Sequence, residues 1–331
     1  MANKVKEIWA AGRVAVNGWL AIPSGFSAEV MAQCGFDSVT VDMQHGVQDY
    51  LSMVQCFQAM QAHPVTPMVR VPWNEPGIIG KVLDGGAYGV ICPMINTRQE
   101  AENFVSYCKY PPRGTRSNGP IRAGLYGSSS GYQATANDET LCIPMIETRT
   151  AVENMEAILD VEGIAGVYVG PSDLGFSYGL VPKLDRDEPE ILKIYEKLVK
   201  ECDKRKIYPG IHCSGPAGAA RAIGLGFRLV TLLNDSGILA TGAVAGAYYN
   251  YAPAPPEIME RVAKMEKVCA AHGVRLPSAA LRFPLHHPQV AAIIPGARTA
   301  REIAMNKETF EAEIPAALWA DLKQEGLVRS D

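Results

Sequence analysis

Eight short apolar stretches alternate with helical patterns along the first three quarters of the chain, and this alternation constrains the fold most strongly. Most read as continuous β-branched or apolar runs, as parallel strands covered by helices do. Apolar residues recur at helical spacing between them, most clearly in Gln99–Cys108, Val152–Leu159 and Pro189–Lys206. The expected strands are Val16–Ile22, Ser38–Asp42, Thr66–Val71, Gly89–Met94, Leu141–Glu147, Gly166–Gly170, Tyr208–Cys213 and Phe227–Leu233. This order predicts an α/β protein with a (β/α)₈ TIM barrel.

A doubly wound open sheet is the alternative fold. It requires a glycine-rich phosphate loop after an early strand, and the sequence contains neither G-x-G-x-x-G nor G-x-x-x-x-G-K-[ST]. With 331 residues, 47% of them hydrophobic, the chain is long enough to bury the large core of one barrel and to carry an appendage. The barrel is therefore the preferred prediction.

Charge and targeting signals exclude several classes of partner. The formal net charge is −4 and no basic block stands out, which argues against nucleic acid or an anionic membrane as the main partner. The N-terminus lacks an apolar signal core, and no run approaches the length of a membrane span. The eight cysteines show no C-x-x-C spacing, so we expect reduced, mostly buried thiols in a cytoplasmic protein.

The chain changes character after Tyr251. The segment Ala252–Pro256 has the composition of a linker, and helices are expected beyond it at Glu257–His272 and near Pro315–Glu325, with an apolar patch around Val290–Ile294. We therefore expect a barrel over residues 1–251 and an appended, structural C-terminal module over residues 252–331. Within the barrel, Lys109–Glu139 is a long connection rich in glycine, proline and serine. A binding loop or lid is the favoured reading, and a surface excursion is the alternative.

Polar side chains stand at the ends of several expected strands. In a barrel of this kind the carboxyl ends of the strands form the mouth, where active sites lie. A single polar residue at a strand end is as often a structural cap as a functional group. Several such residues at the same end of one barrel favour a functional site. The residues concerned are Trp19, Asp42, Gln44, His45, Arg70, Glu147 and the run Gly170-Pro171-Ser172-Asp173.

Two of these residues are candidate metal ligands. Glu147 and Asp173 supply hard oxygen atoms that suit Mg²⁺, Mn²⁺ or Co²⁺ and leave positions for water and substrate. The cysteines and histidines lack the spacing of a structural zinc site. A 2-oxo acid can chelate such a divalent cation through its carboxylate and keto oxygens, and the cation then acts as a Lewis acid that stabilises the pyruvate enolate.

The remaining strand-end residues suit proton transfer and substrate binding. Arg70 offers a planar fork to the enolate oxygen, and His45 can carry a proton at neutral pH. Asp42 belongs to the same catalytic group, and Asp84 could hold the other imidazole nitrogen of His45. Backbone N–H groups at Gly170–Ser172 could bind the substrate carboxylate at a helix start.

A lyase that works through a Schiff base is the mechanistic alternative. It needs a lysine that projects into the mouth, and none of the expected strands contains one. Lys81 and Lys109 fall on a helix or a loop. A metal-dependent mechanism is therefore preferred.

The chain resembles the HpcH/HpaI aldolase family, metal-dependent (class II) pyruvate aldolases on a (β/α)₈ barrel, over about residues 5–250. The matching motifs are Val41-Asp-Met-Gln-His-Gly46, Val69-Arg-Val71, Leu83-Asp-Gly-Gly-Ala87, Tyr110-Pro-Pro-Arg-Gly114, Ile146-Glu147, Asp160-Val-Glu-Gly-Ile164 and Gly170-Pro-Ser-Asp-Leu174. The resemblance implies cleavage of 4-hydroxy-2-oxo acids to pyruvate and an aldehyde, and the reverse aldol addition. It also implies a homo-oligomer, typically a hexamer of paired subunits.

The same resemblance assigns roles to individual residues. It implies that Glu147 and Asp173 bind the metal, that Arg70 binds the keto or enolate oxygen, and that His45 serves proton transfer together with Asp84. Trp19 would wall the pyruvate pocket. Two positions depart from the pattern: many members carry a glutamate where Gln44 stands and a glutamine where Met145 stands. These departures bear on the fine mechanism and on substrate preference, and they leave the two carboxylates in place.

The C-terminal residues resemble a different family, the C-terminal end of aldo-keto reductases. The matching stretches are Ala279–Val290, Ile294–Thr299 and Ile314–Leu322. In that family the Pro-Gly-Ala-Arg stretch helps to bind the adenosine phosphate of NAD(P), but the barrel and catalytic residues of a reductase are missing here. A structural or oligomer-contact role is the better prediction. The resemblance is to aldose dehydrogenase types in particular, which points to an ancestral gene that lay beside a sugar dehydrogenase gene. This favours 2-keto-3-deoxy sugar acids as substrates.

Several assignments stay open at this point. His212, at the end of the seventh strand, either faces the mouth or is structural. Arg122 either binds a distal carboxylate or hydroxyl of the substrate or forms a salt bridge between subunits. An oxaloacetate decarboxylase that uses the same enolate site, a non-catalytic ligand-binding barrel and a bifunctional reductase are the alternative functions.

Overall fold

The computed structural model describes residues 3–126, 131–240, 248–249, 252–253, 256–286 and 300–328. The chain forms two compact units, Met1–Leu239 and Ala240–Asp331. The first unit contains all eight expected strands. The boundary that we expected between residues 251 and 252 falls inside the second unit.

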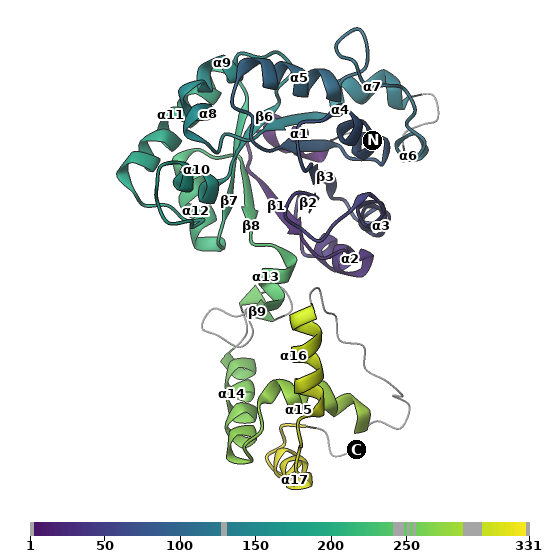
Figure 1. Ribbon diagram of the computed structural model, residues 1–331, viewed down its shortest axis with the longest axis vertical. Coiled ribbons are helices and arrows are strands. Elements are labelled where there is room, and N and C mark those ends of the chain that lie inside the picture. The colour runs from purple at the N-terminus through teal and green to yellow at the C-terminus, as the bar shows by residue number, and fades with distance from the viewer. Residues whose placement is uncertain are drawn as a thin grey trace. The chain divides into compact units, whose positions relative to one another are not determined.

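The strands of the first unit are parallel and form one curled sheet ringed by helices (Figure 1). Their order is β5-β4-β3-β2-β1-β8-β7-β6, and backbone bridges from Cys142 to Ile164 and from Met145 to Tyr168 join the two ends of this series. The strands are β1 Ala15–Leu20, β2 Ser38–Asp42, β3 Thr66–Arg70, β4 Gly89–Cys92, β5 Leu141–Pro144, β6 Gly166–Val169, β7 Tyr208–Cys213 and β8 Leu229–Leu232. The sheet is thus a nearly closed barrel, and the predicted TIM-barrel fold is confirmed.

Helices follow the strands as the apolar spacing predicted. The expected helix Val152–Leu159 is two short helices, because Asn154 ends the first and begins the second while its amide donates to the backbone carbonyl of Asn96. The helices of the first unit are α1 Lys4–Ala10, α2 Gly25–Gln33, α3 Tyr50–Met60, α4 Pro76–Asp84, α5 Arg98–Cys108, α6 Ala123–Tyr126, α7 Tyr132–Glu139, α8 Arg149–Glu153, α9 Met155–Leu159, α10 Pro171–Ser177, α11 Pro189–Arg205, α12 Pro216–Leu225 and α13 Asp235–Ala240.

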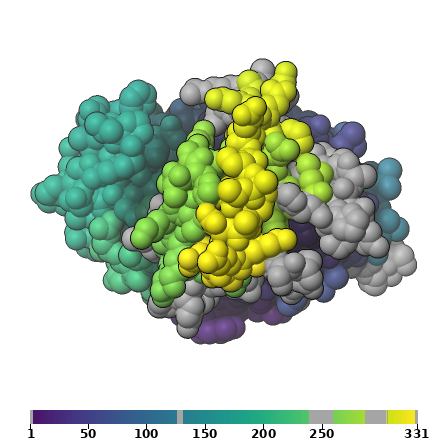
Figure 2. Space-filling view, turned by 90° about the horizontal axis from the view of Figure 1, so that it is seen from below, coloured from purple at the N-terminus to yellow at the C-terminus, as the bar shows by residue number. Residues whose placement is uncertain are grey.

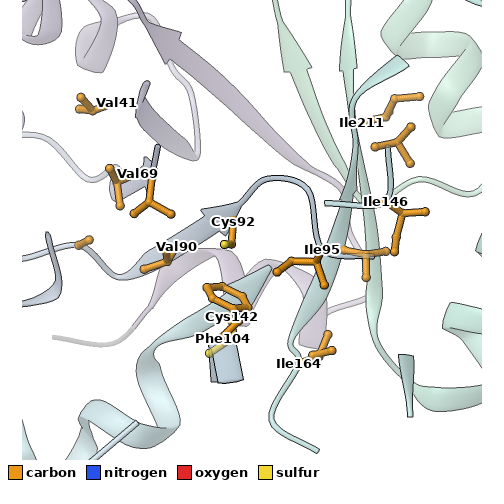
Figure 3. Close-up of a cluster of buried hydrophobic side chains, with 14 of the residues drawn as sticks. Val41, Val69, Val90, Cys92, Ile95, Phe104, Cys142, Ile146, Ile164 and Ile211 are labelled. Atoms are coloured by element: carbon orange, nitrogen blue, oxygen red, sulfur yellow. The ribbon is translucent and has the colours of Figure 1, made fainter. Parts of the chain in front are cut away.

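The main core lies between the outer face of the barrel and its helices. Val41, Val69 and Val90 on neighbouring strands are fully buried, and Cys92 and Cys142 lie in the same cluster as Phe104 of α5 (Figure 3). Seven of the eight cysteines are buried, as expected of thiols that act as small apolar residues. Burial on both faces of the strands explains why they read as continuous apolar runs.

Alternate residues of each strand face the inside of the barrel, and α1 closes its amino end. The Trp9 indole donates to the carbonyl of Arg228 just before β8, and its ring stacks on Tyr208 at 4.5 Å between centroids. The side chain of Asn3, the N-cap of α1, donates to the carbonyls of Tyr88 and Glu139, which precede β4 and β5. With the amino end closed, the opposite end is the open mouth.

The long connection Lys109–Glu139 is anchored rather than loose, where it is described. The ammonium of Lys109 donates to the carbonyls of Asn137 and Thr140. The guanidinium of Arg116 is fully buried, lies over the ring of Tyr110 and donates to Asp84. Because this connection joins the end of α5 to the start of β5, it lies at the amino ends of the strands. The described residues of this connection do not cover the mouth of their own barrel, so within one chain the interpretation as a lid is not supported.

The second unit contains a small helical cluster. Figure 2 shows its green and yellow helices packed against one another, and Cys269, Leu318 and Leu322 are buried between them. Its elements are β9 Tyr248–Tyr249, β10 Ala252–Pro253, α14 Pro256–Ala271, α15 Leu276–Arg282, the 3₁₀ helix Phe283–His286, α16 Ala300–Glu311 and α17 Ala316–Gln324. The expected apolar patch around residues 290–294 lies outside the described residues. Among the helices that are described, none combines the length and apolar character needed to cross a membrane.

Candidate active site

Asp42, the last residue of β2, is the centre of the hydrogen-bond network at the mouth. Arg70 at the end of β3 donates to it twice, from Nε to Oδ1 at 2.8 Å and from Nη2 to Oδ2 at 2.6 Å, and the Trp19 indole donates to Oδ2 at 3.1 Å. Burial alone would raise the pKa of Asp42, but Arg70 and the Trp19 indole together hold it below its ordinary value. Asp42 is therefore an ionised, fully engaged carboxylate that orients its neighbours.

Aromatic rings form a wall beside this ion pair. The guanidinium carbon of Arg70 lies 5.0 Å from the centroid of the Trp19 ring, and Trp19 stacks on Tyr168 of β6 at 5.7 Å. The ring of His212 meets Trp19 edge-on at 5.0 Å. The structure thus brings Trp19, Asp42 and Arg70 together as the sequence predicted, and it places His212 beside them at the mouth.

Glu147 follows β5 and is 2% exposed. Its Oε1 accepts a hydrogen bond from the backbone N–H of Met94 at 2.9 Å, and Met94 has a φ of 57°, a left-handed conformation that is uncommon for a residue with a side chain. On its other side the backbone of Gly170 approaches closely: a Cβ at Gly170 would lie 2.3 Å from Oε2. The carboxylate is therefore held between the loops that follow β4 and β6.

Asp173 lies in the first turn of α10, directly after Gly170, Pro171 and Ser172. Arg186 stabilises the start of this helix. Its fully buried guanidinium donates from Nε to the carbonyl of Pro171 at 3.0 Å and pairs with Glu188. Asp173 itself is exposed. Its short side chain is thus exposed on a fixed turn of the helix, and Gly170 at the start of that helix closely approaches Glu147.

The charges of this pair fit a divalent cation. Burial raises the pKa of Glu147 to about 7, and the negative charge of Asp173 adds to the rise, so two carboxyl groups share a site without enough positive charge. A hard cation with oxygen ligands would supply that charge. No third acidic, histidine or cysteine side chain of the described residues joins them as a metal-binding group. Such a pair leaves coordination positions for water and substrate.

Gln44 and His45 lie on the loop that follows β2. Their backbone N–H groups donate to Asp42 Oδ1 at 3.1 and 3.3 Å, so the same carboxylate that holds Arg70 also fixes this loop. The side-chain Oε1 of Gln44 is buried and has no hydrogen-bond partner among the described residues. The His45 side chain is exposed at the rim. An unsatisfied buried acceptor at this place is suited to a donor from substrate or water.

Two predicted site residues are not brought to the mouth within one chain. Helix α4 begins after β3 and ends before β4, so Asp84, its last residue, lies at the amino ends of the strands, where it pairs with Arg116 at 2.8 Å. Arg122 lies at the same end and donates to the carbonyl of Gly85 at 2.6 Å. The expected contact of Asp84 with His45 is therefore absent within the chain, and Arg122 does not reach the mouth of its own barrel.

The helix start at Gly170–Ser172 is a weaker donor site than the sequence suggested. Pro171 is the first helical residue and has no N–H, which leaves Gly170 and Ser172 as the possible backbone donors there. The main part of Gly170 in the site is steric, since its missing side chain makes room for Glu147.

Three contributors to this site were not predicted from the sequence: the Met94 N–H that holds Glu147, and the hydroxyls of Tyr168 and Thr231 inside the barrel. A signal for the last two was present. Tyr168, Thr231 and Asn17 are polar residues at inward positions of strands that otherwise read as apolar, and such residues need hydrogen-bond partners when buried.

The two parts of the chain match the two families that their motifs resemble. Residues 18–235 match the model of the HpcH/HpaI aldolase/citrate lyase family, and residues 232–325 match the aldo/keto reductase family. A hydroxypyruvate/pyruvate aldolase of Rhizorhabdus wittichii is 40% identical over 243 residues, which are 73% of this chain and 96% of the relative. A 4-hydroxy-2-oxo-heptane-1,7-dioate aldolase of Salmonella dublin is 35% identical over 247 residues, 74% of this chain and 93% of the relative.

Solved structures show the same fold. A HpcH/HpaI aldolase/citrate lyase family protein from Burkholderia cenocepacia superimposes with a TM-score of 0.68 at 28% identity, covering 72% of this chain and 95% of that one. Macrophomate synthase superimposes with a TM-score of 0.62 at 26% identity, covering 69% and 82%. The match therefore extends over most of the length of these proteins and over about 70% of this chain.

Proposed function

The chain belongs to the HpcH/HpaI aldolase/citrate lyase family, and from this premise we propose that its barrel uses the mouth described above to cleave a 4-hydroxy-2-oxo acid into pyruvate and an aldehyde. The protein is a carbon–carbon lyase of the metal-dependent, class II type. The observation that carries the proposed site is the presence of the Glu147–Asp173 pair and the Asp42–Arg70 pair at the same end of the barrel.

Glu147 and Asp173 would hold the divalent cation, for which we propose Mg²⁺, Mn²⁺ or Co²⁺. When bound, the cation supplies Lewis-acid polarisation of the 2-oxo group. Asp173, being exposed, is the ligand that first meets solvent and substrate, whereas buried Glu147 is fixed by the Met94 N–H.

Arg70 and His45 supply the rest of the chemistry. In cleavage a proton leaves the C4 hydroxyl, the C3–C4 bond breaks, and its electron pair forms an enolate whose C3 then takes up a proton to give pyruvate. Two of the five N–H groups of Arg70 are engaged by Asp42, and the others remain for the oxygen on which negative charge develops. His45, exposed at the rim, moves the proton between the C4 hydroxyl and solvent.

Trp19 and Gln44 are the proposed substrate contacts. Trp19 forms part of the pocket wall beside Arg70, and Gln44 Oε1 accepts from a substrate hydroxyl or a bound water. For the leaving aldehyde we propose a sugar-derived chain, which makes 2-keto-3-deoxy sugar acids the substrate class. The resemblance of the C-terminal residues to aldo/keto reductases supports this choice.

The experiment measures pyruvate release from a panel of 2-keto-3-deoxy sugar acids and from 4-hydroxy-2-oxo-heptanedioate, with Mg²⁺, Mn²⁺ or Co²⁺ and after chelation. Glu147→Gln and Asp173→Asn are expected to abolish metal-dependent turnover, and Glu102→Gln, in an exposed ion pair on α5, serves as the control. Full turnover by either variant in the presence of chelator would contradict the assignment. Oxaloacetate run in parallel tests the decarboxylase alternative by the ratio of the two rates.

We also propose that the barrel assembles into a homo-oligomer, as a hexamer of paired subunits. Large apolar side chains are exposed on the loops and near the ends of helices of the first unit, which is a feature of surfaces covered by another chain. They are Phe26, Val47, Leu51, Trp73, Ile121, Leu125, Phe176, Val181 and Ile223. Sedimentation velocity tests this proposal, and a monomer at micromolar concentration would contradict it. For the C-terminal unit we propose a structural or oligomer-contact role.

A further inference from the structure

A connected series of polar side chains runs through the inside of the barrel towards the mouth. Its members are Ser38, Thr40, Asn17, Thr231, Tyr168 and His212. The first five are fully or almost fully buried, where an apolar filling would be the ordinary choice. Buried polar groups in such a series each restrict the proton positions of the next.

The donors and acceptors of this series can be assigned one by one. Asn17 Oδ1 accepts from the hydroxyls of Ser38 at 2.8 Å and Thr40 at 3.0 Å, so its Nδ2 faces Thr231 and donates to Oγ1 at 2.9 Å. Tyr168 donates its hydroxyl proton to the same Thr231 Oγ1 at 2.6 Å. Thr231 Oγ1 thus accepts two hydrogen bonds, and the only proton of the Tyr168 hydroxyl is already used.

This assignment determines the tautomer of His212. The Tyr168 oxygen lies 3.2 Å from His212 Nδ1, and because the phenol has no proton left to give, Nδ1–H must donate to it. Burial, together with the charge of Arg70, lowers the pKa of His212 to about 4, so the ring carries a single N–H at neutral pH. Nε2 is therefore an unprotonated hydrogen-bond acceptor.

The position of Nε2 makes it available to a ligand. His212 is partly exposed, and its Nε2 has no hydrogen-bond partner among the described residues. The ring stands edge-on to Trp19 at 5.0 Å, and Arg70 lies 5.0 Å from the same indole centroid. A neutral acceptor thus lies next to the two side chains proposed to hold the 2-oxo acid.

We infer that His212 Nε2 accepts a hydrogen bond from a substrate hydroxyl, and that Tyr168 is the positioning residue that keeps this nitrogen unprotonated. The inference rests on the proposed function and adds to it a preference for hydroxylated substrates. The hydroxyl belongs either to the 2-oxo acid, as in hydroxypyruvate, or to the aldehyde, as in glycolaldehyde. A site that pairs with a hydroxyl favours the substrate that carries it over the analogue that lacks it.

The test uses the full chain with Mn²⁺ in the addition direction and four substrate pairs: pyruvate or hydroxypyruvate with acetaldehyde or glycolaldehyde. The readout is kcat/KM for each pair, from which the ratio of hydroxylated to unhydroxylated substrate is formed. His212→Leu is expected to lower this ratio about tenfold, the effect of one hydrogen bond of ordinary strength. If the ratio falls for hydroxypyruvate against pyruvate, the hydroxyl belongs to the 2-oxo acid. If it falls for glycolaldehyde against acetaldehyde, the hydroxyl belongs to the aldehyde.

Two further variants separate this role from a structural one. His212→Gln, which can present an amide oxygen, is expected to restore part of the ratio. Tyr168→Phe is expected to lower the ratio, because without the phenol oxygen as acceptor the imidazole can carry its single proton on Nε2 instead of Nδ1. His63→Leu, a histidine before β3, is the matched control and should leave the ratio unchanged.

The ratio stays unchanged if both His212→Leu and His212→Gln lose activity equally on all four pairs or lose none. Either result would overturn the inference while leaving the aldolase assignment standing. Absence of any carbon–carbon bond formation by the wild-type protein would instead overturn the proposed function, and the inference with it.

Discussion

Arg70 and Asp42 form two parallel hydrogen bonds, of 2.8 and 2.6 Å, across the ends of the neighbouring strands β2 and β3. The sheet register pairs these two residues directly, so the fork is built into the barrel and does not depend on a loop. Asp42 orients the guanidinium and accepts from the backbone of the loop that carries His45. One buried carboxylate thus positions two side chains proposed to take part in the chemistry.

Asp42→Asn is expected to lower both stability and turnover. The substitution leaves the poorly exposed Arg70 without its counter-charge, and breaking such a pair costs about 3 kcal/mol. Urea unfolding measures the loss. Asp138→Asn removes an exposed ion pair with Arg113 and should change the free energy of unfolding very little. Equal stability of the two variants would contradict the central place of Asp42.

Gly170→Ala is expected to weaken metal binding without unfolding the protein. The backbone of Gly170, with φ −94° and ψ 92°, suits alanine, but the new Cβ would lie 2.3 Å from Glu147 Oε2 and must displace that carboxylate. A Mn²⁺ titration of turnover measures the change in apparent affinity. Gly80→Ala in α4 meets no atom within 4 Å and should raise stability by about 1 kcal/mol. Unchanged Mn²⁺ dependence in Gly170→Ala would argue against Glu147 as a ligand.

His45→Ala is expected to reduce kcat at least ~100-fold, which is the ordinary contribution of a general acid–base group. The side chain is exposed, so its removal should leave the melting temperature close to that of the wild type. The pH dependence of kcat/KM should lose one of its limbs. If the rate and the profile stay as in the wild type, the proton is moved by another group, such as a metal-bound hydroxide.

His212 is expected to make the protein less stable in acid. Its pKa is about 4 in the folded chain against the ordinary 6.5, so between these two pH values the unfolded chain binds a proton that the folded chain does not. Stability due to this group therefore falls as pH is lowered from 6.5 to 4 and is constant above that window. Melting temperatures from pH 4 to 8 should fall less steeply for His212→Gln than for the wild type. Parallel curves for the two would contradict the assignment.

Much of the fold was predictable because the signals are local. β2 and β7 have the predicted bounds, and the other strands differ by a few residues at their ends. Most differences fall at the carboxyl ends: β5 stops at Pro144, before Glu147, because the chain leaves the barrel there to reach the loop after β4. Apolar runs define where a strand lies, but the last paired residue depends on a neighbour that is distant in sequence.

The site was predictable only in part for a related reason. Trp19, Asp42, Arg70 and His212 end or nearly end their strands, so a barrel brings them together whatever the details. Asp84 was predicted to hold His45, and Arg122 to bind a distal group of the substrate or to form a salt bridge between subunits. Asp84 ends α4 and Arg122 follows α5, and both helices return to the amino end of the barrel, where Asp84 meets the buried Arg116. A helix reverses the direction of the chain, and with it the end at which a residue lies.

The amino-acid sequence by itself determined the alternation of strands and helices, and therefore which residues end a strand, because periodicity and capping act over a few residues. Only the tertiary structure decided how the groups pair: that Met94 holds Glu147, that Gly170 makes room for it, and that Tyr168 gives its proton to Thr231 and so sets the state of His212. The physical reason is that hydrogen bonds and close contacts act over a few ångströms in space. The residues that form them lie on different strands, and only the closed barrel brings those strands together.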